Sequence, residues 1–331
     1  MIEIRDINYS IYSIKLRSTF QTALRSVDSF EVFKVQLTDS QGKIGVGEVV
    51  ATPAITGITP QRVDEDFKSK ILPVLKSMQV INSNDAYQEL LAACPENPTA
   101  RALGDLAICS FLDMPGKFKA KSDVTIPISE IDEIPELVRV RIDSGFNTFK
   151  IKLNDEALQS NLRKVALIHS LLPREGRLRI DPNQSWGVDY SIKFVEETIK
   201  AGIGIEYLEQ PIPKDDYKGL KRIKSESQIE IMADESCFNM IDFERILEHK
   251  ATDWVNVKIL KAGGITPARQ LARAVKDAGL KLSIGCMMES PIGVASAISL
   301  AAEFEPELVH DLDAAWWYPQ SVLMYQKGEV Q

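Results

Sequence analysis

The sequence predicts an α/β protein, a modified TIM barrel of the (β/α)7β type preceded by an α+β capping domain. Two observations lead to this prediction. From about residue 124, short apolar runs alternate with helical patterns, which is typical of parallel strands joined by right-handed crossovers. Before that point, strand patterns come first and helical patterns follow, as in α+β domains. We therefore expect a capping domain at 1–120 and a barrel at 121–331.

The composition agrees with a soluble protein of two parts. A chain of 331 residues suits one large barrel plus a smaller domain, and 44% hydrophobic and 26% charged residues are ordinary values. A net charge of −8 argues against nucleic acid and anionic membranes as partners, because both attract basic surfaces. The sequence has no transmembrane run, no signal-peptide pattern and no CxxC pair among its 4 cysteines. We expect a cytoplasmic protein with a small-molecule partner, and a homo-oligomer is left open.

The first half of the capping domain has the pattern of antiparallel strands. Apolar and polar residues alternate over 33–37, and a turn at 39–42 leads into the next strand. Two polar loops are expected, at 19–26 and at 51–57. Apolar residues then recur at helical spacing through 60–118, which predicts helices.

The barrel is expected to contain eight strands with seven helices between them. The strands are predicted at 124–131, 148–153, 178–181, 205–209, 229–234, 254–260, 281–288 and 308–313. The helices are predicted at 133–144, 155–172, 189–201, 217–225, 240–249, 267–279 and 293–304. An open doubly wound sheet is the alternative, but no glycine-rich phosphate loop follows the first strand, so a dinucleotide site is not supported.

Ionisable side chains follow the second to eighth strands at their C-terminal ends, where barrels of this kind carry their chemistry. They include Lys150, Lys152, Asp181, Glu209, Asp234, Glu235, Lys258, Glu289, Asp311 and Asp313. One such residue could be a solvated loop residue. The whole series is harder to explain in that way, because buried strands rarely finish in charges without a reason.

The second strand carries two lysines on one face. Residues 149–153 alternate apolar and cationic, so Lys150 and Lys152 point the same way. Neighbouring ammonium groups repel each other, which lowers their pKa values and suits a base near neutral pH. The alternative is an edge strand whose lysines discourage aggregation.

Three carboxylates end three consecutive strands and predict a metal site. Asp181, Glu209 and Asp234 would converge and repel one another unless a divalent cation joined them. All-oxygen ligands favour a hard ion, Mg²⁺ before Mn²⁺, with one ion per chain. Asn183 lies two residues past Asp181 and is expected to support the ligands. Strand alternation is expected to turn Glu235 away from the site.

Two of the lysines are expected to face each other. Lys152 and Lys258 lie on the second and sixth strands, which are opposite in a ring of eight. The α-carbon of a bound carboxylate would then lie between them. One lysine would remove the α-proton and the other would return a proton to the opposite face, while the metal and Lys150 stabilise the enolate. Lys261 has the opposite parity to Lys258 and is expected to be structural.

The chain resembles the enolase superfamily, in its muconate-lactonising subgroup. The motifs that carry the resemblance are K-I-K at 150–152, D-P-N-Q at 181–184, E-Q-P at 209–211, A-D-E-S at 233–236, N-V-K at 256–258 and K-A-G-G-I at 261–265. The resemblance covers nearly the whole chain. It implies a Mg²⁺-dependent enzyme in which lysine bases act through an enolate, as is known of this superfamily.

Within this subgroup the resemblance is greatest to dipeptide epimerases. Asp311 and Asp313 share a face and suit a free α-ammonium group, and D-L-D is similar to the signature of that family. The T-A-L-R sequence that ends at Arg25 resembles members acting on L-Ala-D/L-Glu, in which the arginine would bind the glutamate side chain. Thr56, in a second capping loop, and Met288 are further expected substrate contacts.

The resemblance therefore implies an isomerase of murein peptide metabolism that epimerises the C-terminal residue of a dipeptide. Two alternatives stay open. An o-succinylbenzoate synthase or N-succinyl amino acid racemase would use the same lysines and metal, although its substrates have no ammonium group for the aspartate pair. A non-catalytic binding barrel would not bind Mg²⁺.

Overall fold

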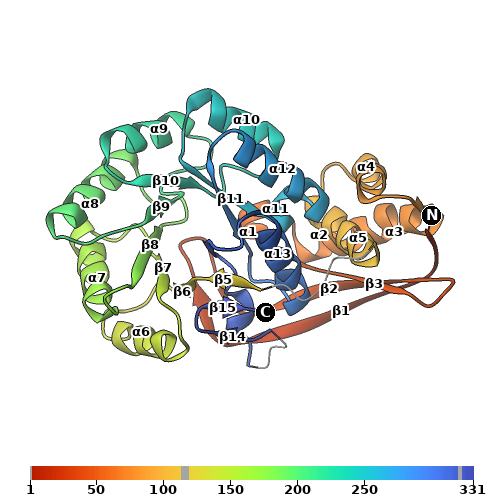
Figure 1. The fold of residues 1–331 in the computed structure, drawn as a ribbon, viewed down its shortest axis with the longest axis horizontal. Helices are drawn as coiled ribbons and strands as arrows, with labels where there is room; N and C mark the ends of the chain where they lie inside the picture. The colour runs from red at the N-terminus through yellow and green to blue at the C-terminus, as the bar shows by residue number, and fades with distance from the viewer. Residues whose placement is uncertain (1, 113–118, 320–322) are drawn as a thin grey trace.

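The computed structural model of the protein describes residues 2–112, 119–319 and 323–331. Figure 1 shows two parts, a parallel sheet that curls within an arc of helices and an antiparallel sheet that carries a second group of helices. The predicted fold class, a modified barrel with an α+β region before it, is confirmed.

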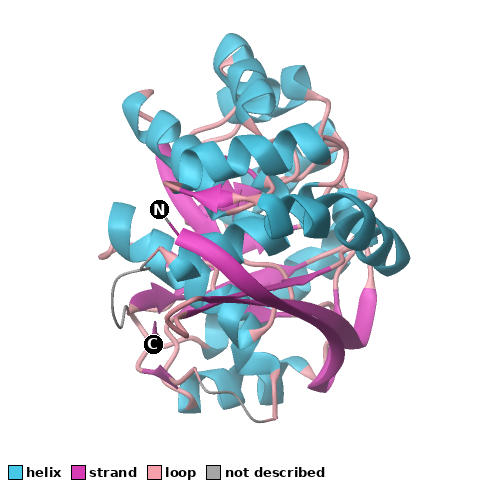
Figure 2. Cartoon of the chain, turned by 90° about the vertical axis from the view of Figure 1, so that its right-hand side faces the viewer, coloured by secondary structure: helices cyan, strands magenta, loops and turns pink. Residues whose placement is uncertain are grey.

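The N-terminal sheet has four strands in the order β3-β2-β1-β4. The strands are β1 (Ile2–Gln21), β2 (Ser26–Asp39), β3 (Ile44–Val50) and β4 (Gln79–Val80). Figure 2 shows the longest of them as curved ribbons across the molecule. The loop expected at 19–26 is shorter than predicted, because Phe20 pairs with Val27 in the ladder and buries its ring, which leaves only 22–25 as the turn.

The second expected loop, at 51–57, contains one helical turn, α1 (Pro53–Thr56). Gly57 ends this turn with a φ of 74°, a conformation that favours glycine. The helices that follow are α2 (Pro60–Asp66), η1 (Phe67–Ile71), α3 (Leu72–Ser77), α4 (Ser83–Ala93) and α5 (Pro98–Phe111). They confirm the helices predicted within 60–118, although β4 interrupts them and 113–118 lie outside the described residues.

Helix α5 is buried along nearly its whole length and packs on β2 and β3. The close approach requires glycine in β3, since a Cβ on Gly47 would lie 2.3 Å from the carbonyl oxygen of Leu103. Helix α5 also packs against two barrel helices, α11 (Ile259–Ala262) and α12 (Ile265–Asp277). It therefore joins the N-terminal sheet to the barrel (Figure 1).

Seven parallel strands form the barrel sheet in chain order. They are β6 (Val124–Ile126), β7 (Thr148–Lys152), β8 (Arg177–Asp181), β9 (Tyr207–Glu209), β10 (Glu230–Ala233), β11 (Trp254–Lys258) and β12 (Lys281–Gly285). With α12, the helices outside the sheet are α6 (Ile134–Asp143), α7 (Leu158–Leu171), α8 (Val188–Lys200), α9 (Tyr217–Glu226), α10 (Met240–His249) and α13 (Pro291–Phe304). Several strands end earlier than predicted, and α11 occupies the end of the run expected at 254–260.

The eighth strand differs from the prediction. Instead of a strand at 308–313, the chain has β13 (Val309–His310), which pairs with β5 (Ala120–Ser122). Beyond it, Asp311 makes an isolated bridge to Gly285, at the end of β12. On the other side, the carboxylate of Asp313 accepts a hydrogen bond from Thr125 N at 2.7 Å. Because Asp123 N also donates to the carbonyl oxygen of His310 at 2.9 Å, one backbone and one side-chain hydrogen bond together join this segment to the start of β6.

The C-terminal segment connects back to the N-terminal sheet. The hairpin of β14 (Tyr325–Gln326) and β15 (Glu329–Val330) joins β5, and the short helix η2 (Ala314–Trp317) packs against β1. The rings of Phe20 and Trp317 meet edge to face at 5.0 Å. One buried apolar cluster consequently runs through both parts of the protein. The boundary at residue 120 stays a prediction.

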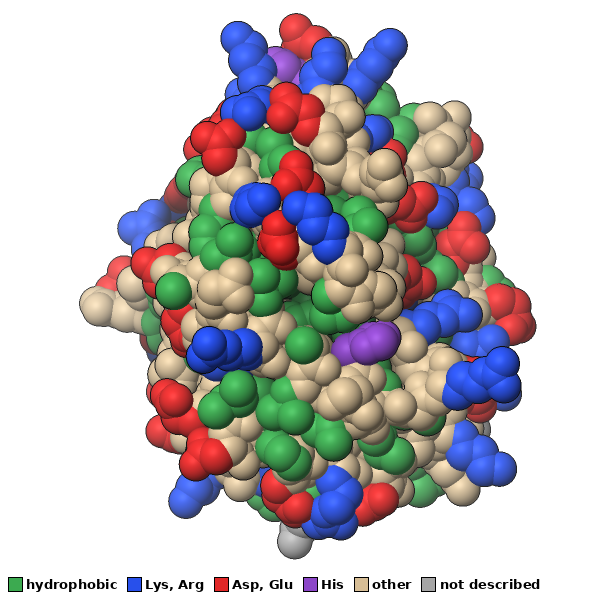
Figure 3. Space-filling model, turned by 90° about the vertical axis from the view of Figure 1, so that its left-hand side faces the viewer, with side chains coloured by type: hydrophobic (Ala, Val, Ile, Leu, Met, Phe, Trp, Pro, Cys, Tyr) green, Lys and Arg blue, Asp and Glu red, His purple; other side chains and the backbone are tan. Residues whose placement is uncertain are grey.

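On the face of the barrel shown in Figure 3, acidic and basic side chains are intermingled between small apolar patches. Among the helices of the described residues, none is both long enough and apolar enough to span a membrane.

Candidate active site

The C-terminal ends of the barrel strands open into a pocket that the capping region covers. The empty space, its open mouth included, is about 520 Å³. The barrel contributes Thr125, Lys152, Asn183, Asp234, Lys258, Asp311 and Asp313 to the lining. The turn after β1 and helix α1 contribute Phe20, Thr22, Leu24, Arg25 and Ile55, and the segment after β12 contributes Cys286, Met287 and Met288. Most residues singled out in the sequence therefore meet in one place.

Three buried carboxylates, those of Asp181, Glu209 and Asp234, converge beside this pocket. One oxygen of each lies within 4.8 Å of the other two. Mg²⁺ binds carboxylate oxygens at about 2.0–2.1 Å, so a cluster of this size could hold one ion. Glu209 Oε2 lies 2.8 Å from Lys150 Nζ yet accepts no hydrogen bond of suitable angle. The all-oxygen set fits a hard divalent cation.

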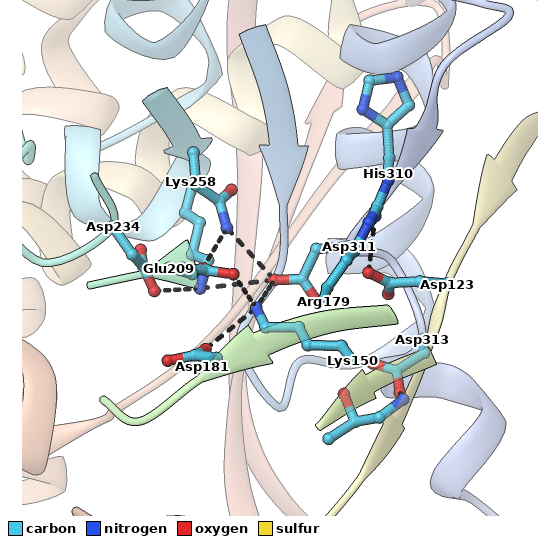
Figure 4. Close-up of polar contacts among 12 residues, drawn as sticks. Asp123, Lys150, Arg179, Asp181, Glu209, Asp234, Lys258, His310, Asp311 and Asp313 are labelled. Carbon is cyan, nitrogen blue, oxygen red and sulfur yellow. Dashed lines mark hydrogen bonds and ion pairs between the residues drawn. The ribbon is translucent and has the colours of Figure 1, made fainter. Parts of the chain in front are cut away.

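Lys150 lies at the centre of the carboxylates (Figure 4). Its Nζ is 2.8 Å from Glu209, 2.9 Å from Asp311 and 3.2 Å from Asp181. Lys152 projects from the same face of β7 and pairs with Asp181. The prediction that repulsion lowers the pKa is wrong for Lys150. Its burial acts in that direction, but the surrounding carboxylates, Asp311 first, raise the pKa well above the usual lysine value.

Lys258 enters the pocket from the other side of the barrel. Its Nζ lies 2.8 Å from Asp234 Oδ2 and 3.7 Å from Asp311. Burial would lower its pKa, but these two carboxylates raise it above the usual lysine range. Lys261, expected to be structural, donates to the carbonyl oxygen of Asn256 at 2.8 Å and to Asp234 Oδ1 at 2.7 Å. It therefore also orients a predicted metal ligand, and it helps hold the pKa of Asp234 below its usual range against the opposing effect of burial.

Asn183 contacts two carboxylates, those of Asp181 and Glu235, so Glu235 does not point away from the site as expected. The backbone N of Asn183 donates to Asp181 Oδ1 at 2.9 Å, and its side-chain amide donates to Glu235 Oε1 at 3.1 Å. The alternation argument fails because β10 ends at Ala233, before either acidic residue. Burial first, and then the neighbouring charges of Asp234 and Asp181, raise the pKa of Glu235 to about 8.

The aspartate pair after β13 lines the pocket from both positions. Asp311 Oδ2 accepts hydrogen bonds from Lys150 Nζ and, at 3.3 Å, from the amide of Asn256. Asp313 accepts from Thr125 N and, at 3.1 Å, from the indole N–H of Trp317. These contacts hold both carboxylates in place and leave them at the pocket surface. The two carboxylates can therefore bind a cationic group that enters the pocket.

The capping side of the pocket contains a guanidinium with no described counterion. Arg25 lines the pocket, and in the described part of the chain no hydrogen bond or ion pair of its side chain is found. Burial lowers its pKa to about 10. Thr56 does not line the pocket, because its hydroxyl is used within helix α1, where it donates to Thr52 O. Its neighbour Ile55 lies there instead, and Met288 lines the pocket from the β12 side.

Two amide side chains organise the site, and the first was missed in the sequence. Gln210 Oε1 accepts from the backbone N of Asp234 at 3.1 Å and of Ser236 at 2.9 Å. Its place directly after Glu209, in the E-Q-P motif, was the available signal. Asn256, noted only for its position, donates to Glu209 Oε1 at 3.0 Å. Gln210 therefore holds the backbone at Asp234, and Asn256 holds a carboxylate of the candidate metal cluster.

Comparison with known proteins identifies the family. The family described as Enolase C-terminal domain-like matches residues 133–331. The chain is similar to the L-Ala-D/L-Glu epimerase of Francisella tularensis subsp. novicida (strain U112), with 30% identity over 331 aligned residues that cover 96% of this chain and 92% of the relative.

Two solved structures have the same fold and similar length. A substrate-liganded complex of the L-Ala-D/L-Glu epimerase from Bacillus subtilis superposes with a TM-score of 0.92 at 26% identity, covering 100% of this chain and 96% of the other. The dipeptide epimerase from Enterococcus faecalis V583, complexed with Mg and the dipeptide L-Leu-L-Tyr, gives a TM-score of 0.90 at 26% identity, covering 100% and 97%. This chain belongs to the enolase superfamily, and it is an isomerase.

Proposed function

We propose that the protein is a Mg²⁺-dependent dipeptide epimerase that inverts the α-carbon of the C-terminal residue by transfer of protons between two lysines. One observation carries the proposal. Lys152 and Lys258 enter one pocket from strands on different sides of the barrel, beside three buried carboxylates that suit a divalent cation. The similarity to dipeptide epimerases supports the same reaction class.

In this mechanism one lysine is neutral and the other charged. The neutral amine takes the α-proton, the electron pair moves into the substrate carboxylate as an enolate, and the opposite ammonium gives a proton to the other face. The ammonium of Lys150, deeper in the site, stabilises the negative charge. Mg²⁺ held by Asp181, Glu209 and Asp234 would supply Lewis-acid stabilisation of the same charge. Lys152 and Lys258 must first release the carboxylates that they contact in this structure.

The two ends of the pocket favour a dipeptide with an acidic C-terminal residue. Asp311 and Asp313 are placed for the α-ammonium group of the first residue. Arg25 is desolvated, charged at neutral pH and without a described partner, so an anion stabilises it. L-Ala-D/L-Glu has both groups, which supports it as the substrate and supports a role in murein peptide metabolism.

The test is proton NMR of L-Ala-L-Glu and of L-Ala-D-Glu in D₂O with enzyme and Mg²⁺. Loss of the glutamate α-proton signal together with formation of the other diastereomer is expected, and chelation of the metal is expected to stop both. Exchange only with dipeptides that have neutral or basic C-terminal residues would refute the role of Arg25. If no dipeptide exchanges and an N-succinyl amino acid does, the dipeptide proposal is wrong.

A further inference from the structure

Helix α12 of the barrel is capped by a residue of the N-terminal part. The residue at its own N-cap position, Gly264, has no side chain to offer. Instead Asp105, on α5, accepts from the backbone N of Thr266 at 2.9 Å and from its hydroxyl at 2.7 Å. A carboxylate at this position satisfies free N–H groups of the first turn and interacts favourably with the helix dipole.

The chain between the barrel sheet and α12 is shaped to admit α5. A Cβ on Gly264 would lie 2.4 Å from Asp105 Oδ2, and a Cβ on Gly263 would lie 2.9 Å from Arg101 Nη2. Both glycines also have positive φ, 146° and 89°. A larger residue at Gly264 would meet Asp105 as far back as its Cβ, 2.9 Å away, and would push α5 away from the barrel, whereas at Gly263 the end of the Arg101 side chain would have to move. The two glycines of the K-A-G-G-I motif therefore serve the contact between the two parts of the protein.

The same short segment carries two lysines of the active site. Lys258 is the last residue of β11, and helix α11 follows it directly. The carbonyl oxygen of Ile259 accepts from the backbone N of both Gly263 and Gly264 at 3.0 Å, which makes one compact turn. From this turn, Lys261 reaches back to Asp234. Movement at Thr266 would thus be transmitted over a few residues to both lysines.

We propose that Asp105 is a positioning residue, which through its hydrogen bonds to Thr266 fixes the 258–266 segment and so places Lys258 over the substrate and Lys261 on Asp234. The placement of Lys258 over the substrate rests on the proposed function. The placement of Lys261 on Asp234 does not depend on it.

Burial gives independent support to a role in placement over one in stability. Asp105 is fully buried, and burial raises its pKa to about 6. The charged form is therefore less favourable in the folded than in the unfolded chain at neutral pH. An asparagine would provide an acceptor for Thr266 N and a donor for its hydroxyl without that cost.

The first readout is exchange of the α-proton in D₂O at Mg²⁺ concentrations that saturate every variant, measured separately from each diastereomer of L-Ala-Glu. The wild type should exchange both. In Asp105→Ala, the exchange rate of one diastereomer is expected to fall about 10- to 100-fold, because a small misplacement of a reacting group has effects of this size. The affected diastereomer should be the one whose exchange is lost in Lys258→Ala. Asp105→Asn should restore the rate. A purely structural contribution would lower both exchange rates equally.

The second readout needs no turnover. Calorimetric titration with Mg²⁺ alone is expected to show about 10-fold weaker binding for Asp105→Ala, because residues behind metal ligands typically contribute that much to affinity. Gln270→Ala is the matched control, since it removes a 3.2 Å hydrogen bond from α12 to Asn84 in the N-terminal part without touching the 258–266 segment. Both measurements are made well below the unfolding temperature of each variant.

The inference would be overturned if Asp105→Ala had the same ratio of exchange rates between the two diastereomers as the wild type, and the same affinity for Mg²⁺. If that variant does not fold, Thr266→Val decides the question in the same two assays, with a smaller expected effect. It removes the hydroxyl that donates to Asp105 and that also lies 3.3 Å from Cys109 Sγ, and it leaves the hydrogen bond from Thr266 N in place. If the wild-type protein exchanges neither diastereomer, the proposed function is wrong, and the Mg²⁺ titration alone decides whether Asp105 positions the segment.

Discussion

Replacement of Lys150 by methionine should show how much the buried ammonium group contributes to the free energy of unfolding, independently of any catalytic role. The ammonium has three carboxylate neighbours within 3.2 Å and is 1% exposed. Removal of one partner from a buried ion pair typically costs about 3–5 kcal/mol, because the remaining charge is left without compensation. Here the charges left behind are those of Asp181, Glu209 and Asp311. We therefore expect Lys150→Met to lose about 3–5 kcal/mol of unfolding free energy in the absence of divalent ions.

Mg²⁺ should recover a large part of this loss. A ligand present at 100 times its dissociation constant stabilises the folded state by about 2.7 kcal/mol, and removal of a nearby positive charge should strengthen Mg²⁺ binding. The assay is urea unfolding of wild type and Lys150→Met, with and without Mg²⁺. The control is Lys164→Met on α7, which removes a single ion pair, 2.8 Å long, to Glu156. A loss below about 1 kcal/mol without metal, or equal Mg²⁺ stabilisation in both proteins, would refute the reasoning.

Three further predictions concern bases, specificity and pH. Lys152→Ala and Lys258→Ala should each abolish epimerisation while each variant still exchanges the α-proton of only one diastereomer in D₂O; full turnover by either would exclude the two-base mechanism. Arg25→Met should raise KM for L-Ala-Glu about 10- to 100-fold, the value of hydrogen bonds to a charged group, with little effect on a dipeptide that ends in a neutral residue. Because the pKa of Asp105 is raised from 3.8 to about 6, its contribution favours folding at acid pH and is lost as pH rises through 6. Relative to Asp105→Asn, the wild type should therefore lose about 2 to 2.5 kcal/mol of unfolding free energy between pH 4 and 7; a constant difference would contradict this.

The parts of the site that could be predicted depend on local geometry. Strand parity correctly put Lys150 and Lys152 on one face, because β7 is regular through both residues. The same rule failed at Asp234 and Glu235, which lie beyond the last regular residue of β10. Side chains point to alternate faces only while the backbone stays extended. Because the candidate active-site residues lie where strands end, the rule becomes unreliable at these positions. The fold class could be predicted because it depends on many strands and helices together, so an error at the end of one strand does not change it.

Other features depend on contacts that no local pattern encodes. The pKa of Lys150 is set partly by Asp311, 161 positions away in the chain. Asp105 and Thr266 are separated by the same number of positions. The eighth strand was predicted too long because regular pairing ends at His310, and Asp313 contacts Thr125 N through its side chain. Each case required the three-dimensional arrangement.

In the proposed mechanism, the charge balance of the buried site would link metal binding to the release of a proton from a lysine. Four ammonium groups face four carboxylates within it: Lys150, Lys152, Lys258 and Lys261 against Asp181, Glu209, Asp234 and Asp311. With the carboxylate of Asp313 assigned to the substrate ammonium group, a divalent cation added to this neutral set would leave two uncompensated positive charges in a region of low dielectric constant. Entry of the substrate carboxylate offsets one of them. Loss of a proton from a lysine would offset the other, and Asp234, the first of the carboxylates that raise the pKa of Lys258, is one that the cation would draw away. On this reasoning the lysines are ion-pair partners without metal, and one of them becomes a base when metal and substrate are both present.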